Sequence, residues 1–417
     1  MFEKLIYLLL FITFGYSQIQ SQHILTSTDL LRQLTALDQS SLPYTQNLDF
    51  IRTNNQQLPL IDDISFRTET DENDIRQQEY LLRFKFNSKK ERHAQSQITQ
   101  TSQEKYQLKQ EEFLLNKIKS HYLNLIYFRF ISEELQLQRD KLLLLKDKKT
   151  IFEKLLKNGT EFNLSKWLTN EDEIIKISSL ILAFSKQKQG ILQDFFPEDQ
   201  PRDSIQFSDW ITNSTIQKVM LSILNKTIKT NKEALASNTY KTSKAAYNLE
   251  NAQSKKWFDY TQIKYKGNEK NPLSEEFSLG IAIHIPSPSK NRIKKNKTRL
   301  KMIENQYKTR LITEKSNRRT KELKEQLLRL FSQYELYQKH IKQLALQASY
   351  DSFTNNGHTI LSPLDIIELK SAIIRQKLEK LKIEKDLCLI FVELLYHSKM
   401  LSQTPLTNYL SNNLTTF

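Results

Sequence analysis

The sequence predicts a mainly α-helical protein with a small β part, in which long helices of coiled-coil type form a tandem repeat. Glycine and proline are scarce, with six and nine in 417 residues, against roughly 12% together in average proteins. Apolar residues recur at seven-residue spacing. An Asn-Gly pair and a strand-like segment each occur twice, and the two copies are separated by nearly the same number of residues. All-β sandwiches and glycine-rich nucleotide-binding folds need more glycine and proline, so long helices are expected.

The N-terminal residues 1–17 have the layout of a secretory signal peptide. Lys4 precedes an apolar stretch from Leu5 to Phe14, and small residues follow. That stretch is too short for a membrane-spanning helix, which needs about 20 residues. An ordinary apolar first helix is the alternative. An exported chain with so little cysteine fits the periplasm or outer membrane of a bacterium.

Two landmarks indicate a tandem duplication. An Asn-Gly pair, followed by Leu-Ser, occurs in both halves, and its glycines, Gly159 and Gly357, are 198 residues apart. Strand-like segments over residues 80–86 and 277–285 end 199 residues apart. Each strand-like segment precedes a basic stretch and then a long helical pattern.

Seven-residue spacing predicts helices that supercoil against neighbours. A helix over about residues 88–158 would be roughly 105 Å long at 1.5 Å per residue. Each copy then turns at its Asn-Gly and sends a second helix back. The seam of the last helix consists of Ile367, Ile374, Leu381, Cys388 and Leu395.

Residues 58–87 and 257–286 predict two β-hairpins, each with one apolar and one polar face. Arg67, Arg83 and Lys85 fall on the polar face. Strands of about 9–11 residues with this alternation suit a transmembrane barrel, although a sheet packed on helices gives the same pattern. Four strands cannot close a pore, so three protomers giving a trimeric twelve-stranded barrel is the smallest symmetric solution with a water-filled lumen.

The residues do not favour catalysis. Cys388 excludes a disulfide framework and a multi-cysteine zinc site, and we expect it in the core rather than as a nucleophile. The seven histidines lack ligand spacing, and no glycine-rich phosphate loop is present. We expect no catalytic residue, no metal and no cofactor. The net charge of +15 alone suggests nucleic-acid binding, which the export signal and the lack of a basic–aromatic module oppose.

The ordered features resemble the TolC family of outer-membrane efflux and secretion ducts over roughly residues 40 to 400. The signal peptide, the hairpin–helix–tip–helix unit in two copies and a strand ending in Ile285-Pro286 carry the resemblance. The segment 362–369 resembles the family pattern Ser-x-x-Asp-Leu-Leu-x-Ala after a glycine, and 58–71 resembles the first hairpin of divergent members.

This resemblance implies a homotrimer with a barrel in the outer membrane and a helical tunnel in the periplasm. The tunnel would conduct small molecules or polypeptide passively, in efflux or type I secretion. Its gated entrance would open on meeting a periplasmic adaptor (membrane fusion protein) and an inner-membrane pump. The alternative is a non-conducting periplasmic coiled-coil scaffold derived from the same fold.

The resemblance maps the entrance carboxylates of the family to Asp365 and Glu368, which share a helix face. Three copies would form two acidic rings, which select cations. Alternatively, Asp365 only caps its helix. Lys166 stands where the family often has Asp, which puts an acidic first tip in doubt. The residues mapped to the adaptor-contacting tips are Gly159, Leu164, Ser165, Gly357, Leu361 and Ser362.

Basic side chains leave two questions open. Arg67, Arg83 and Lys85 would line a cationic lumen, or pair with nearby carboxylates such as Glu69. The basic runs 89–92 and 290–299 would touch acidic lipid head groups or form a solvated helical face.

The sequence therefore divides into nine segments. These are a signal peptide (1–17), an N-terminal periplasmic segment (18–57), a first β-hairpin (58–87), a first helical hairpin (88–193), an equatorial interruption (194–212), a helix returning to the barrel (213–256), a second β-hairpin (257–286), a second helical hairpin (287–402) and a C-terminal tail (403–417). We expect the tail to be disordered or to lie on the equatorial belt.

Overall fold

A computed structural model describes most of the chain. The described residues are 25–40, 43–54, 57–70, 78–158, 163–195, 205–207, 209–224, 229–266, 277–283, 292–350 and 362–417. The expected signal peptide lies outside them. Contacts divide the chain into two units: unit 1 comprises residues 1–40, 115–227 and 320–417, and unit 2 comprises residues 41–114 and 228–319.

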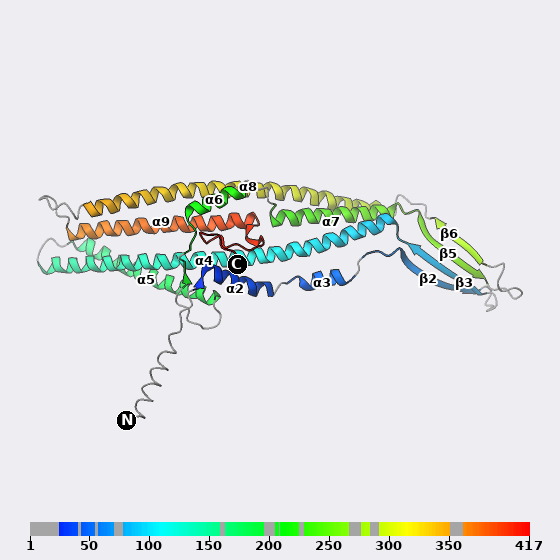
Figure 1. The fold of residues 1–417 in the computed structure, drawn as a ribbon, viewed down its shortest axis with the longest axis horizontal. Coiled ribbons are helices and arrows are strands. Elements are labelled where there is room, and N and C mark those ends of the chain that lie inside the picture. The colour runs from blue at the N-terminus through cyan, green and yellow to red at the C-terminus, as the bar shows by residue number, and fades with distance from the viewer. Residues whose placement is uncertain are drawn as a thin grey trace, which may run out of the picture. The chain divides into compact units, whose positions relative to one another are not determined.

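The predicted mainly helical fold with a small β part is confirmed. Two long helices, α4 (Lys89–Lys157) and α8 (Arg292–Tyr350), contribute residues to both units. Each follows a pair of antiparallel strands and precedes a shorter helix, α5 (Leu164–Phe195) or α9 (Pro363–His397). Figure 1 shows this order along the chain. Within the described residues, no helix is both long and apolar enough to cross a membrane.

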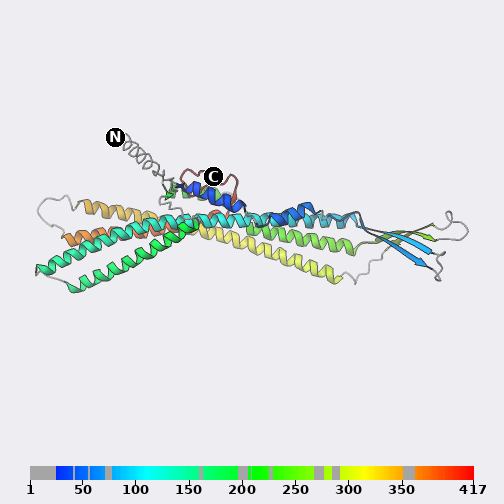
Figure 2. The same ribbon diagram turned by 90° about the horizontal axis from the view of Figure 1, so that it is seen from below.

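Unit 1 is built around helices that pack in pairs. Ion pairs join α4 to α5 and to α9, and Figure 2 shows α5 running back beside the second half of α4. The smaller elements of unit 1 are β1 (Leu25–Thr26), α2 (Ser27–Ser40), β4 (Ile205–Gln206), α6 (Asn213–Leu224) and the 3-10 helix η2 (Met400–Ser402). Strand β1 pairs with β4 in parallel.

The core of unit 1 follows the predicted heptads. All five seam residues of α9, from Ile367 to Leu395, are buried. On α4 the buried apolar seam shifts by one residue after Leu125, because the 3.6-residue helical period drifts against a seven-residue repeat. Its buried members are Leu115, Ile118, Tyr122, Leu125, Phe128, Ile131, Leu135 and Leu145. Each such side chain contributes roughly 1.5–3 kcal/mol by burial.

The C-terminal tail is ordered, so of the two alternatives expected for it, disorder is wrong. Asn408 is fully buried, and its Nδ2 donates to Ser27 Oγ and Thr28 Oγ1, each at 2.9 Å. Ser411 forms an isolated bridge with Trp210, next to the interruption between the two helical hairpins. Buried polar groups need partners, and these contacts supply them.

Unit 2 contains one four-stranded antiparallel sheet and the helices beside it. The sheet order is β2-β3-β5-β6, so both predicted hairpins are present and adjacent. The elements are α3 (Thr45–Thr53), β2 (Ile61–Thr70), β3 (Gln78–Phe86), the first part of α4, α7 (Asn231–Ser254), β5 (Phe258–Lys266), β6 (Phe277–Ile283) and the first part of α8.

The helices of unit 2 pack through small and polar side chains. Ala94, Ala245 and Ala252 are buried, and the buried Asn238 donates through Nδ2 to Glu104 Oε2 at 3.0 Å. A capping box formed by Thr230 and Glu233 begins α7. Small residues let helix backbones approach closely, while the amide bonds fix the register between the helices.

Candidate functional site: an amphipathic sheet and two helical hairpin ends

One face of the sheet is apolar across all four strands. Opposite residues of an antiparallel pair share a face, and the register places Leu82 opposite Ile263 and Phe84 opposite Ile64. We call this the apolar sheet face. It consists of Ile64, Phe66, Tyr80, Leu82, Phe84, Phe86, Phe258, Ile263, Tyr265, Phe277, Leu279, Ile281 and Ile283.

The apolar sheet face is exposed within the chain. Leu279 is 76% exposed, Phe66 65% and Ile283 64%. A contiguous apolar patch of this extent marks a surface that another molecule or a membrane covers.

The opposite face is polar, and its cations have partners. Arg67, Arg83 and Lys85 all lie on it, as expected. Arg67 Nε lies 2.9 Å from Glu69 Oε1, which is the pairing that the sequence suggested, and Lys85 Nζ lies 3.1 Å from Asp62 Oδ2. The Arg83 guanidinium stacks 3.9 Å from the centroid of the Tyr260 ring. The two ion pairs reduce the positive field on this face, whereas the Arg83 charge has no carboxylate partner among these contacts.

The sheet is open, with an outer strand on each side. Strands β2 and β6 are the outer strands of the order, and no other described strand pairs with their outer edges. A free edge presents a row of unpaired backbone groups that can pair with another chain.

The structure describes some of the residues that were predicted to lie at the ends of the helical hairpins. Leu164 and Ser165 are the first two residues of α5, and Leu164 is 57% exposed. Ser362 is the N-cap residue of α9. Gly159, Gly357 and Leu361 lie outside the described residues.

Asp365 forms a capping box with Ser362. Its Oδ2 accepts from the Ser362 backbone N at 3.0 Å and from the Ser362 hydroxyl at 2.7 Å. The hydrogen bonds from the Ser362 side chain and backbone, and to a smaller extent the charge of Lys166, lower the pKa of Asp365. The capping alternative is therefore seen in the structure. The side chain also remains exposed, which leaves its charge accessible.

Glu368 pairs across the two helical hairpins. Its Oε1 lies 3.3 Å from Lys148 Nζ on α4. Together with Lys166 near Asp365, this places two lysines of the first hairpin against the acidic pair of the second. Sequence reasoning missed Lys148, because it is an unremarkable lysine in a lysine-rich helix, 220 residues away.

Comparisons with known proteins rest on structure alone. No family model matches the sequence, and no curated protein matches it in sequence. The fold is similar to that of the outer membrane protein VceC from Vibrio cholerae, with 11% identity, coverage of 89% of this chain and 92% of that one, and a TM-score of 0.57. It is also similar to the outer-membrane channel OprN, with 11% identity, coverage of 88% and 89%, and a TM-score of 0.58.

A third similar structure is the open state of the MtrE outer membrane channel from Neisseria gonorrhoeae, with 11% identity, coverage of 89% and 86%, and a TM-score of 0.55. This chain has the TolC-like fold. At this identity the likeness concerns the fold and carries no residue-level assignment.

Inside unit 1, half-buried charges join two helices of the TolC-like fold. Arg129 on α4 lies 3.5 Å from Glu384 on α9 and stacks over the Trp210 ring at 4.5 Å. Burial raises the pKa of Glu384, against the opposing effect of Arg129. Burial also raises the pKa of Cys388 to about 12, so its thiol is protonated and unreactive at neutral pH.

A second ion cluster joins the same two helices of the TolC-like fold. Glu393 on α9 contacts Lys119 on α4 and lies 3.4 Å from His397 Nε2. Hydrogen bonds from His397 and Lys119 lower the pKa of Glu393 to about 2. Among the described residues, no group of acidic, histidine or cysteine side chains could hold a metal ion. These clusters hold helices together and present no nucleophile.

Proposed function

We propose that this chain is the outer-membrane channel-tunnel of an efflux or type I secretion system. It conducts small molecules or polypeptide passively from the periplasm to the exterior. The observation that carries the proposal is the sheet: one face is apolar and exposed, the other is polar, and no other described strand pairs with either outer edge. The similarity in fold to outer membrane channels supports it.

The sheet needs both lipid and partner strands. In a bilayer, each unpaired backbone group at an edge costs several kcal/mol, so β2 of one copy must pair with β6 of the next. Three copies supply twelve strands and leave a water-filled lumen lined by the polar face. Arg67, Arg83 and Lys85 then face the lumen.

Two exposed helical seams support association of several copies. On α5, Leu168, Ile175 and Leu182 follow seven-residue spacing and are 50%, 67% and 74% exposed. On α8, Ile293 and Leu300 are 81% and 58% exposed at the same spacing. An apolar heptad seam exposed in one chain fits a coiled coil with a second copy.

The helical hairpin ends form the gated entrance in this proposal. Asp365 and Glu368 of three copies surround the axis as acidic rings, and Lys148 and Lys166 reduce their charge. The tips that contain Gly159, Leu164, Ser165, Gly357, Leu361 and Ser362 meet a periplasmic adaptor, which joins the channel to an inner-membrane pump.

The alternative is a non-conducting periplasmic scaffold. One observation favours it: the described part of β6 spans seven residues, fewer than the 9–11 that a membrane-spanning strand needs. In that case the apolar sheet face would be covered by protein rather than lipid.

Extraction and conductance distinguish the two. We expect the exported protein to require detergent for extraction, to purify as a trimer and to conduct ions in planar bilayers. Release by osmotic shock as a protein that does not conduct would support the scaffold.

A matched pair of variants tests the two faces of the sheet. Leu279→Arg should block insertion, since arginine on a lipid face costs roughly 2–4 kcal/mol at the bilayer midplane. Ser278→Arg, on the polar face of the same strand, should insert and change only conductance.

A further inference from the structure

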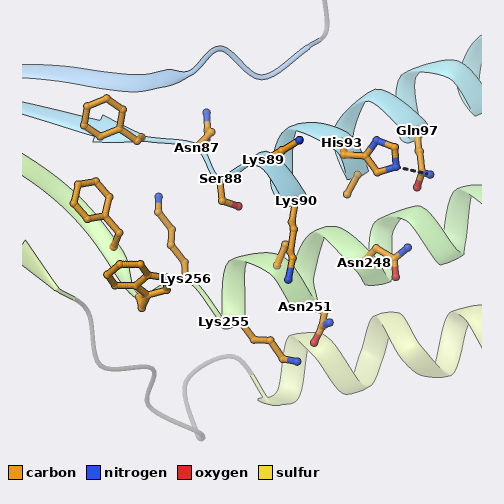
Figure 3. Close-up of a pocket in the computed structure, with 15 residues that line it drawn as sticks. Asn87, Ser88, Lys89, Lys90, His93, Gln97, Asn248, Asn251, Lys255 and Lys256 are labelled. Atoms are coloured by element: carbon orange, nitrogen blue, oxygen red, sulfur yellow. Dashed lines mark hydrogen bonds between the residues drawn. The ribbon is translucent and has the colours of Figure 1, made fainter.

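A cationic pocket lies where the sheet of unit 2 meets its helices. It has a volume of about 710 Å³ and is lined by the chain from β3 into α4 and by the chain from α7 into β5. Lys89, Lys90, Lys255 and Lys256 all line it, and the lining residues include no carboxylate. Figure 3 shows Lys90 extending from α4 toward α7, and Lys256 extending toward Asn87.

The carboxylates around this pocket form their hydrogen bonds and ion pairs with groups other than the four pocket lysines. Glu91 caps α4 by accepting from the Ser88 backbone N at 2.6 Å, and Glu250 on α7 pairs with Lys294 at 2.7 Å. Asp62 pairs with Lys85 and also lies within electrostatic range of the pocket residue Lys256. Asp259 lies within electrostatic range of Lys85. Within the described part of the chain, none of the four pocket lysines forms an ion pair.

Uncharged donors complete the pocket. The amides of Asn248 and Asn251 on α7 line it, as does the Ser88 hydroxyl. The Asn87 amide also lines it, but its Nδ2 donates to Pro59 O at 3.0 Å and to Asp62 Oδ1 at 3.2 Å. Ammonium groups combined with amide and hydroxyl donors suit an anion with several oxygens, such as a phosphate.

The pocket borders the end of the apolar sheet face. Phe86 and Phe258 belong to both, and their ring centroids are 5.8 Å apart. Trp257 lines the same border and is 64% exposed. Tryptophan is enriched at the boundary between membrane and water. A ligand with an anionic head and apolar tails would match both parts of this surface, whereas a free anion would leave the aromatic border unused.

We propose that this pocket binds the phosphate head group of an anionic membrane glycerophospholipid, whose acyl chains lie along the apolar sheet face. The inference rests on the proposed function, because it needs the sheet to stand in a bilayer. It adds a lipid site that fixes the depth of the sheet in the membrane.

The test uses the full-length protein purified in a neutral detergent and stripped of lipid. Binding of phosphatidylglycerol and of phosphatidylcholine, which carries no net charge, is measured by native mass spectrometry and by the shift in melting temperature. We expect phosphatidylglycerol to be preferred, and Lys89→Gln/Lys90→Gln/Lys255→Gln/Lys256→Gln to weaken its binding about tenfold or more, since each cation near an anionic surface contributes. The variant in which the same four lysines are replaced by arginine keeps the charge and should retain binding. This result would show that substitution at these positions does not by itself abolish binding.

The matched control removes the same charge from four exposed lysines of α8, as Lys297→Gln/Lys301→Gln/Lys308→Gln/Lys315→Gln, and should bind as the unaltered protein does. Equal loss in this control would overturn the proposal in favour of general electrostatic attraction. Competition by inorganic phosphate or glycerol 1-phosphate as strong as that by the lipid would also overturn it, in favour of a free anion. Conductance in phosphatidylcholine bilayers reports on the proposed function separately. A conducting protein without lipid preference refutes this inference alone.

Discussion

Lys148 Nζ on α4 lies 3.3 Å from Glu368 Oε1 on α9, so this ion pair joins the two helical hairpins of unit 1 near their ends, beyond the pairs Lys119–Glu393 and Arg129–Glu384. The Glu368 side chain is 60% exposed. A pair this exposed contributes less than about 1 kcal/mol to stability. Its position across two hairpins makes it a candidate for holding the proposed entrance closed rather than for holding the fold together.

Breaking this pair should open the entrance with little loss of stability. We expect Lys148→Gln and Glu368→Gln each to raise the mean conductance in planar bilayers severalfold while leaving the melting temperature nearly unchanged. The swap Lys148→Glu/Glu368→Lys should restore the closed conductance, because it rebuilds the pair with reversed charges. Failure of the swap to restore it would show that the two side chains act separately.

Two double variants of Asp365 and Glu368 separate the proposed acidic rings from the role of Asp365 in capping α9. Asp365→Ala/Glu368→Ala should raise conductance or remove block by added divalent cations at the periplasmic mouth. Asp365→Asn/Glu368→Gln keeps an acceptor for the Ser362 amide and should give the same change in block. If conductance and block stay as they are in both variants, the acidic rings are not part of the entrance.

One buried hydroxyl, that of Tyr122, bonds to the backbone of the tail at two places. Tyr122 donates to the Thr407 carbonyl at 2.8 Å and accepts from the Tyr409 amide at 3.0 Å. Tyr122→Phe leaves both backbone groups without their partner, at a cost of about 1–3 kcal/mol. We expect a lower melting temperature and faster proteolysis within residues 403–417. Tyr127→Phe, which removes a half-buried hydroxyl from the same helix, is the control and should behave as the unaltered protein.

Acid should weaken the α4–α9 contact at Glu393. Because the pKa of Glu393 in the folded protein is about 2, below the ordinary value of 4.5, its stabilising effect is present above pH 4.5 and is lost as the pH falls toward 2. Glu393→Gln should therefore lower the free energy of unfolding at pH 7 by roughly 1–2 kcal/mol after solvent screening, and with it the melting temperature.

The difference between Glu393→Gln and the unaltered protein should shrink as the pH falls from 4.5 to 2. Glu379→Gln, at an exposed position on the same helix, should show no such pH-dependent difference. A constant difference over this range would mean that Glu393 acts through packing rather than through charge.

The exposed seam of α5 should govern assembly. Ile175→Glu/Leu182→Glu places charges on the apolar heptad positions, where a coiled-coil partner would bury them. We expect loss of the trimer in analytical ultracentrifugation with helical content unchanged. Thr169→Glu/Gln187→Glu adds the same charge at exposed positions on another side of α5 and should remain trimeric. Trimers formed by the seam variant would place the contact between copies elsewhere.

Much of the fold was predictable because its signals are local and periodic. The seam from Ile367 to Leu395 repeats every seven residues, and all five of its members are buried. The alternation along 277–285 is equally regular, and its described part forms β6 with one apolar face. In both cases the residues that share a face are near neighbours in sequence, so spacing alone identifies them.

The candidate site was predictable only in part. Asp365 and Glu368 were found from a short motif, but the lysine that pairs with Glu368 was not, because nothing local distinguishes Lys148 from the other lysines of α4. The tail was left undecided between disorder and packing, since its polar composition does not reveal that Tyr122 and Ser27 supply its hydrogen bonds.

The order of hairpins and long helices, their amphipathic faces and the resemblance to the TolC family were determined by the sequence alone, since each depends on residues close together in the chain. The tertiary structure decided which helices share ion pairs, where the tail docks and that two basic segments about 160 residues apart enclose one pocket. Such contacts join segments whose separation along the chain carries no periodic signal, so only the folded packing brings their charges and donors within reach.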